Sequence, residues 1–159
     1  MKVGIIVYSQ SGNTLSVAQK LEEVIKSAGH TVNIARVEPV SEDARSPLKS
    51  APDITPYDAV IFASSVQAFS LAPVMKLYLS QISDKTGKQA SCFVTQHFKR
   101  KFLGGNRAVR QITAACKAKG IEVICSGVVN WSSDIREKQI DDIVTRLSSI
   151  YGKNEEHQY

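Results

Sequence analysis

Residues 9–14 carry the side chains of this chain that are best suited to bind a ligand. The segment follows an apolar run, holds hydroxyl and amide side chains with one glycine, and contains no charged residue. Hydroxyls, amides and the unpaired backbone N–H groups at the start of a helix all donate to anions, and the helix dipole adds to the attraction. The segment therefore predicts a site for a phosphate monoester, bound by neutral donors from Ser9, Gln10, Ser11, Gly12, Asn13 and Thr14.

An ordinary helix N-cap at Asn13, preceded by a polar turn, is the alternative interpretation of this segment. Six consecutive uncharged polar or glycine residues favour the phosphate site instead. The segment lacks the lysine of the nucleoside-triphosphate loop and the glycine spacing of the dinucleotide loop. It also contains no cysteine, which excludes the phosphatases that use a cysteine nucleophile in a similar loop.

Apolar runs typical of buried strands alternate along the chain with helical patterns. The helices are expected directly after residues 9–14, from Pro73, across residues 108–116, and from a cap at Ser132 or Ser133. This alternation predicts a doubly wound α/β fold, in which ligands lie beyond the carboxyl ends of the parallel strands. The five expected strands cover residues 2–8, 31–37, 58–64, 91–97 and 122–129.

Residues 38–57 interrupt this pattern because they show no helical stripe and hold four of the five prolines. A structureless loop of ~20 residues is uncommon in a compact domain, so we expect a short helix or turn within it. The chain is long enough to form one domain, expected over residues 1–152. Residues 153–159 are expected to form a frayed tail.

Composition excludes several classes of protein. The formal net charge is +5, but no nucleic-acid-binding motif accompanies the basic residues. No apolar run approaches the ~20 residues of a membrane-spanning helix. The cysteines have no metal-ligand spacing, and we interpret them as buried free thiols of a cytoplasmic protein. They are Cys92, Cys116 and Cys125.

The first expected strand and its loop resemble the signature of the flavodoxin family. The signature consists of apolar residues and an aromatic residue, followed by a Ser or Thr, a small residue, a Thr and a later Ala. This chain departs from it only at Val7, which stands where the aromatic residue is usual. The matching positions are Ile5, Ile6, Val7, Tyr8, Ser9, Gln10, Ser11, Gly12, Asn13, Thr14 and Ala18. Residues 57–79 and 92–98 resemble the family's third and fourth strands with their flavin loops, and the uninterrupted fifth strand resembles its short-chain branch.

The resemblance implies a flavodoxin-like three-layer sandwich with strand order 2-1-3-4-5 and FMN as the cofactor. It implies that residues 9–14 bind the FMN phosphate and that two further loops hold the isoalloxazine ring. Flavodoxins usually stack this ring on Trp or Tyr, whereas this chain offers Phe69 and Phe98. The implied ring-binding residues are Ser64, Ser65, Val66, Gln67, Ala68, Phe69, Thr95, Gln96, His97 and Phe98.

Two activities and one inactive class are compatible with the resemblance. An electron carrier would exchange electrons with a redox partner protein through the flavin ring. An NAD(P)H-dependent quinone or FMN reductase resembles this chain at residues 95–97, which precede a glycine pair. In the reductases the glycines come sooner, whereas six residues intervene here before Gly104, which favours the carrier. A flavin-free interaction domain is the third class.

Lys99, Arg100 and Lys101 depart from the family pattern, because flavodoxins that carry electrons are acidic around the flavin. Positive charge near a reduced, anionic ring stabilises it, so the cluster predicts a less negative reduction potential. The same cluster would suit the 2′-phosphate of NADPH or an acidic protein partner.

Overall fold

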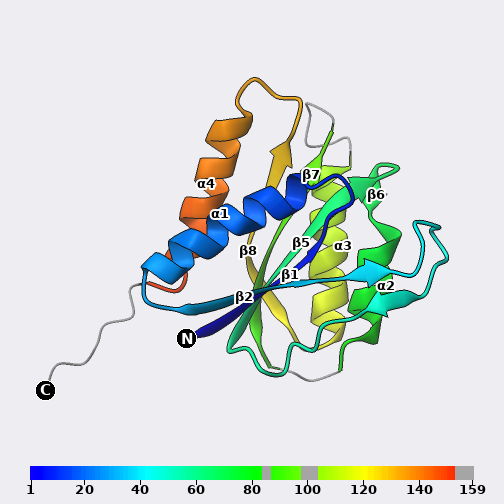
Figure 1. Cartoon of the computed structure of the whole chain (residues 1–159), viewed down its shortest axis with the longest axis horizontal. Helices are drawn as coiled ribbons and strands as arrows, with labels where there is room; N and C mark the ends of the chain where they lie inside the picture. Colours follow the sequence, from blue (N-terminus) through cyan, green and yellow to red (C-terminus); the bar gives the residue numbers. More distant parts are fainter. Residues whose placement is uncertain (84–86, 98–103, 153–159) are drawn as a thin grey trace, which may run out of the picture.

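A five-stranded parallel sheet forms the centre of the protein. The computed structural model describes residues 1–83, 87–97 and 104–152. The strand order is β2-β1-β5-β7-β8, which confirms the predicted doubly wound sheet (Figure 1). The five strands are β1 (Lys2–Tyr8), β2 (Thr31–Arg36), β5 (Ala59–Gln67), β7 (Gln89–Gln96) and β8 (Glu122–Asn130).

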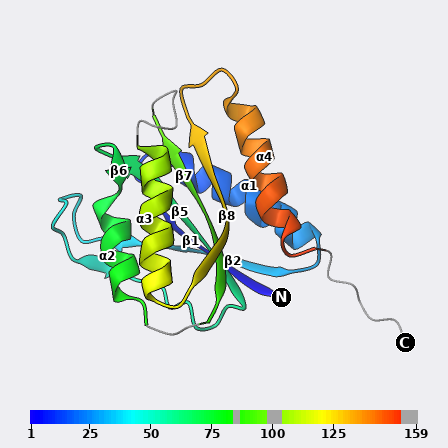
Figure 2. The ribbon, with the colours of Figure 1, turned by 180° about the vertical axis from the view of Figure 1, so that it is seen from behind.

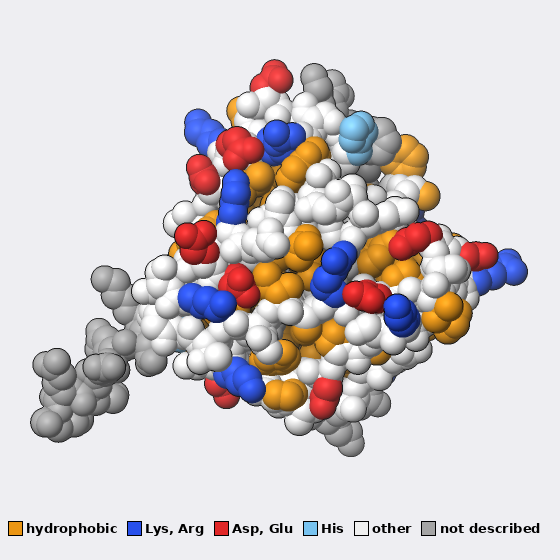
Figure 3. All heavy atoms as spheres, viewed as in Figure 1, with side chains coloured by type: hydrophobic (Ala, Val, Ile, Leu, Met, Phe, Trp, Pro, Cys, Tyr) orange, Lys and Arg blue, Asp and Glu red, His pale blue; other side chains and the backbone are white. Residues whose placement is uncertain are grey.

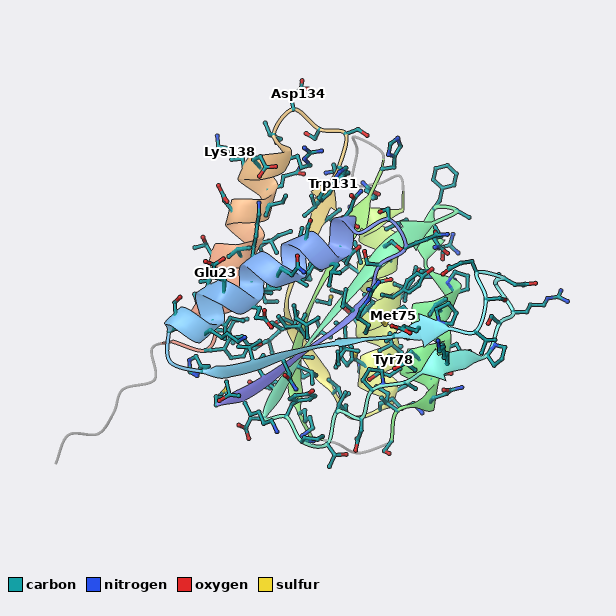
Figure 4. All side chains as sticks on the ribbon, in the orientation of Figure 1. Glu23, Met75, Tyr78, Trp131, Asp134 and Lys138 are labelled. Atoms are coloured by element: carbon teal, nitrogen blue, oxygen red, sulfur yellow. The ribbon has the colours of Figure 1, made fainter. Side chains whose placement is uncertain are left out.

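Two helices cover each face of the sheet, which makes three layers (Figures 1 and 2). On one face lie α1 (Asn13–Ser27) and α4 (Arg136–Ser149), and on the other α2 (Pro73–Gln81) and α3 (Gly105–Ala118). Successive residues of a strand face opposite sides, so Ile5 packs towards α1 and α4 while Ile6 packs towards α2 and α3. Met75 and Tyr78 fill the second core from α2 (Figure 4). Burial on both faces is why the central strands are continuously apolar.

Residues 38–57 contain turns and no helix, which agrees with the expectation of a short helix or turn there. They form an antiparallel pair, β3 (Glu38–Pro39) with β4 (Leu48–Ser50), that the sequence did not predict. The backbone then turns, with the N–H of Tyr57 donating to the carbonyl of Ile54 at 3.1 Å. Ile54 is buried against the α2 and α3 core, and this contact holds the segment on the domain without a helix.

The last helix begins later than the expected cap at Ser132 or Ser133 would place it. Its first residue is Arg136, and Ser133 instead lies in a turn, where its Oγ accepts the N–H of Ile135 at 3.2 Å. The cysteines also differ from one another. Cys92 and Cys116 are buried, as expected, but Cys125 on the edge strand β8 is only half-buried. The expected tail, residues 153–159, lies outside the described residues.

No helix in the described parts of the chain has the length and apolar character needed to cross a membrane.

Candidate functional site

The loop after β1 leads into helix α1, whose N-cap residue has no side chain. The N-cap is Gly12 rather than Asn13, with a left-handed φ of 90°, which glycine adopts without steric cost. Gly12 has no side chain to cap α1, and no acidic residue occupies the first turn of the helix. The positive end of the helix dipole is therefore left for an anion.

The side chain of Ser9 holds this loop against the start of α1. Its hydroxyl is buried and accepts the N–H of Gly12 at 3.1 Å and that of Leu15 at 3.3 Å. The guanidinium of Arg36 donates to the Ser9 carbonyl at 3.3 Å. Arg36 comes from β2, and the parallel pairing of Val7 with Arg36 brings it beside the loop. The loop sequence itself contains no cation, so the sequence analysis did not predict Arg36 as a site residue. The register of β1 with β2 would have placed Arg36 beside the loop.

Thr14 joins this loop to the end of β7. Its Oγ1 lies 2.7 Å from Oγ1 of Thr95, and both side chains are buried. Thr14 and Thr95 are 81 residues apart in the sequence and were predicted to hold opposite ends of one ligand. In the structure their hydroxyls bond to each other, so they fix the relative position of the two loops.

The predicted loops meet at the carboxyl ends of β1, β5 and β7 (Figure 1). They line a hollow of about 230 Å³. Every residue lining it belongs to the set predicted from the sequence. They are Gln10, Ser11, Asn13, Ser65, Val66, Gln67, Thr95, Gln96 and His97. Three segments far apart in the chain thus meet at the predicted edge of the sheet.

The other predicted residues lie beside the hollow or beneath it. Ser64 is fully buried, and its Oγ donates to the Ser65 carbonyl at 3.0 Å. Ser9, Gly12, Thr14, Ala68 and Phe69 belong to the converging loops without lining the hollow. Phe98 and the basic cluster Lys99, Arg100 and Lys101 lie outside the described residues, so their expected roles remain predictions.

Ala68 and Phe69 form the tip of a hairpin that the sequence did not predict. β5 turns back into the two-residue strand β6 (Ser70–Leu71), with Gln67 opposite Ser70. Both tip residues have positive φ, 49° and 60°, a conformation that favours glycine and asparagine. Phe69 is 50% exposed. The backbone of the tip lies against Gly104, where a Cβ would come within 2.7 Å of the Phe69 Cα.

A hydrogen-bonded chain connects this hairpin to the first loop. The amide nitrogen of Gln67 donates to Oε1 of Gln10 at 3.0 Å and to the hydroxyl of Tyr8 at 3.3 Å. The Tyr8 hydroxyl in turn donates to a carboxylate oxygen of Glu42 at 2.8 Å. Burial and the carboxylate of Glu42 raise the pKa of Tyr8. Glu42 was not predicted as a site residue because no local pattern connects it to a loop 34 residues away.

Gln96 anchors the third loop from within the protein. Its side chain is buried, donates to Oδ1 of Asn130 and accepts the N–H of Gly105 at 2.8 Å. The Gln96 carbonyl accepts the N–H of Trp131 at 2.7 Å, directly after β8 (Figure 4). Gln96 thus fixes the first residue of α3 relative to β7. Its predicted contact with the flavin ring stays a prediction, as does that of its exposed neighbour His97.

Comparison with known proteins identifies the family. The family model described as a flavodoxin domain matches residues 4–122, well over half of the chain. The chain belongs to the flavodoxin family. The match spans all three converging loops and the first four strands of the sheet, so the resemblance noted at residues 5–18 extends through the candidate site. Flavodoxins as a family bind FMN and transfer electrons.

Solved flavodoxin structures share this fold along nearly the whole chain. Flavodoxin 2 from Bacillus cereus is 18% identical, with a TM-score of 0.68 over 94% of this chain and 99% of its own. The Streptococcus pneumonia TIGR4 flavodoxin is also 18% identical, with a TM-score of 0.67 over 94% and 99%. A WrbA-like flavodoxin from Agrobacterium tumefaciens is 10% identical, with a TM-score of 0.64 over 94% and 96%. At these identities the likeness establishes the fold and leaves the individual activity to the site.

Proposed function

We propose that this protein is an FMN-binding electron carrier of the cytoplasm. One observation carries the proposal: three sequence-distant loops line a single hollow beside a helix N-terminus that has no acidic residue in its first turn. The free cysteines suit a reducing compartment. When bound, FMN supplies the redox chemistry of its isoalloxazine ring.

The residues at the hollow fit this cofactor. The helix start and the exposed Ser11 offer neutral donors to a phosphate, without a carboxylate in the first turn to oppose it. Ser65 Oγ is buried at the hollow and has no hydrogen-bond partner among the described residues. An unmade buried hydrogen bond is costly, so a polar ligand group at Ser65 would be favoured. Phe69 and His97 supply exposed rings at the rim of the loops for flavin packing.

The proposed phosphate site is tested by titrating the purified, flavin-free protein with FMN and with riboflavin, which lacks the phosphate. We expect FMN to bind at least about a hundredfold more tightly, because charged hydrogen bonds and the helix dipole act only on the phosphate. Ser11→Asp places a carboxylate at the helix start and should abolish this preference without weakening riboflavin binding. Ser80→Asp on α2 is the matched control and should leave the preference intact. Equal affinity for both flavins, or no flavin binding at all, would contradict the proposal, and the latter would favour an interaction domain.

An NAD(P)H-dependent reductase of the same fold is the second candidate, favoured by residues 95–97 and the following glycine pair. Both glycines have structural contacts: Gly104 lies against the Phe69 backbone and Gly105 donates to Gln96. Neither lines the hollow, which supports the carrier. We expect NADPH alone to reduce the FMN-loaded protein slowly, on the scale of hours. Complete bleaching of the flavin absorbance within seconds would identify a reductase instead.

A further inference from the structure

Among the described helices, the excess of positive charge lies on one layer. On the α1 and α4 layer, each helix carries equal numbers of basic and acidic residues, and both signs are interspersed across the face in Figure 3. On the α2 and α3 layer, the two helices carry basic residues and no carboxylate. These residues are Lys76, Arg107, Arg110 and Lys117.

The basic residues of α3 form an exposed stripe. Arg107, Arg110, Ala114 and Lys117 are all exposed and follow the spacing i, i+3, i+7, i+10, which places them on one side of the helix. Arg107 and Arg110 form no ion pair within the parts of the chain that the structure describes. At the far end, Lys117 shares a depression with the carboxylate of Glu122. The uncompensated charge therefore lies on the N-terminal half of α3.

This arrangement is unfavourable for the helix itself. Arg107 lies in the first turn, where the dipole repels a cation, and like charges three residues apart repel one another. No ion pair among the described residues offsets these two repulsions. An acidic partner bound to the stripe would do so.

The stripe is also next to the candidate flavin site. α3 begins at Gly105, whose N–H is bonded to Gln96 of the hollow, and two residues later the chain reaches Arg107. A groove of about 360 Å³ runs from Asn106 and Arg110 across to α4, beside the open edge of β8. Its one carboxylate, Asp142, is paired with Arg146 at 2.9 Å, so the Arg110 side of the groove stays positive.

We propose that the N-terminal half of α3, with Arg107 and Arg110, is the docking surface for an acidic electron-transfer protein. The partner's carboxylates would pair with the two guanidinium groups and with the adjoining groove. Docking there brings the partner beside the loops of the flavin site, so the inference rests on the proposed carrier function. Charge complementarity of this kind sets the encounter rate and the salt dependence of binding.

The test uses an acidic [2Fe–2S] ferredoxin as the probe and calorimetry at low and physiological ionic strength. Arg107→Glu/Arg110→Glu should weaken ferredoxin binding by about tenfold or more at low salt and remove most of its salt dependence. Lys20→Glu/Lys138→Glu is the matched control, because it makes the same change in net charge on α1 and α4. Lys138 lies on α4 (Figure 4). The control should change the affinity by less than about threefold.

Several outcomes would overturn the docking surface. An equal loss of affinity in both variants would mean that net charge alone acts. Unchanged ferredoxin binding in the α3 variant would exclude the stripe as the docking surface. The proposal would also be overturned if the protein bound duplex DNA and the α3 variant alone lost that binding. Arg107→Glu/Arg110→Glu should not lower the thermal unfolding temperature, because a carboxylate in the first turn of α3 interacts favourably with the helix dipole.

Failure of the docking surface is distinguishable from failure of the carrier function. Flavin absorbance reports FMN uptake by each variant separately from ferredoxin affinity. A chain that takes up FMN but binds ferredoxin without Arg107 and Arg110 contradicts only the docking surface.

Discussion

Thr14 and Thr95 share a buried hydrogen bond that decides how two of the site's loops meet. Removing one partner leaves the other hydroxyl buried without a bond, which costs about 1–3 kcal/mol. We therefore expect Thr14→Val and Thr95→Val each to lower the free energy of unfolding by this amount. The double variant removes both hydroxyls and should be less destabilised than the sum of the two. Urea denaturation measures all four proteins, and strict additivity would show that the two hydroxyls act independently.

Single residues also show where prediction from sequence ends. The uncharged polar run at 9–14 is a local signal, so the loop and its place after the first strand were predictable. The partners of this loop were not, because Arg36 and Thr95 reach it through strand pairing rather than along the chain. Gln96 was predicted as a ring contact from its position, but its amide is occupied by Asn130 and Gly105. FMN contact by Thr95 and Gln96 stays a prediction.

The glycines that precede α1 and α3 have different surroundings, so the same substitution should have different effects at the two helix starts. Gly12 and Gly104 precede α1 and α3, and both have positive φ. A Cβ at Gly12 meets no atom within 4 Å, so Gly12→Ala should cost only the backbone strain, about 1–2 kcal/mol. A Cβ at Gly104 meets the Phe69 backbone at 2.7 Å, so Gly104→Ala should cost clearly more and displace the hairpin tip. Thermal unfolding ranks the two variants, and an equal loss of stability would contradict this account.

Elements with a long periodic pattern were predicted well, and short ones were not. The five strands of the parallel sheet and the four helices of the described residues follow from apolar runs and helical stripes. β3, β4 and β6 have two or three residues each, too few for any period to emerge. Their pairing depends on contacts made after the sheet forms, such as the burial of Ile54. The hairpin at Ala68 also lacks the glycine or asparagine that typically indicates such a turn in a sequence.

At the scale of the whole molecule, one core contains two buried thiols that tie stability to pH. Cys92 and Cys116 both lie in the core beneath α2 and α3. Burial raises the pKa of each thiol from 9.0 to about 12. Below pH 9.0 both thiols are protonated in the folded and unfolded states, so their contribution to stability is fully present. As the pH rises further, the unfolded chain loses these protons first, and the folded state is destabilised until the folded pKa is reached.

The free energy of unfolding should therefore fall on the alkaline side. Once the unfolded thiols are ionised, each group contributes a slope of about −1.4 kcal/mol per pH unit up to the folded pKa. The pKa of Tyr151 is also raised, to about 12, which adds to the slope above pH 10.0. Urea denaturation at intervals between pH 8 and 10 isolates the thiols, because tyrosines ionise later. Cys92→Ala/Cys116→Ala should be less stable at pH 7 through the lost packing, but its stability should fall less steeply over this interval. A parallel decline in both proteins would show that the thiols do not set the alkaline limit of this fold.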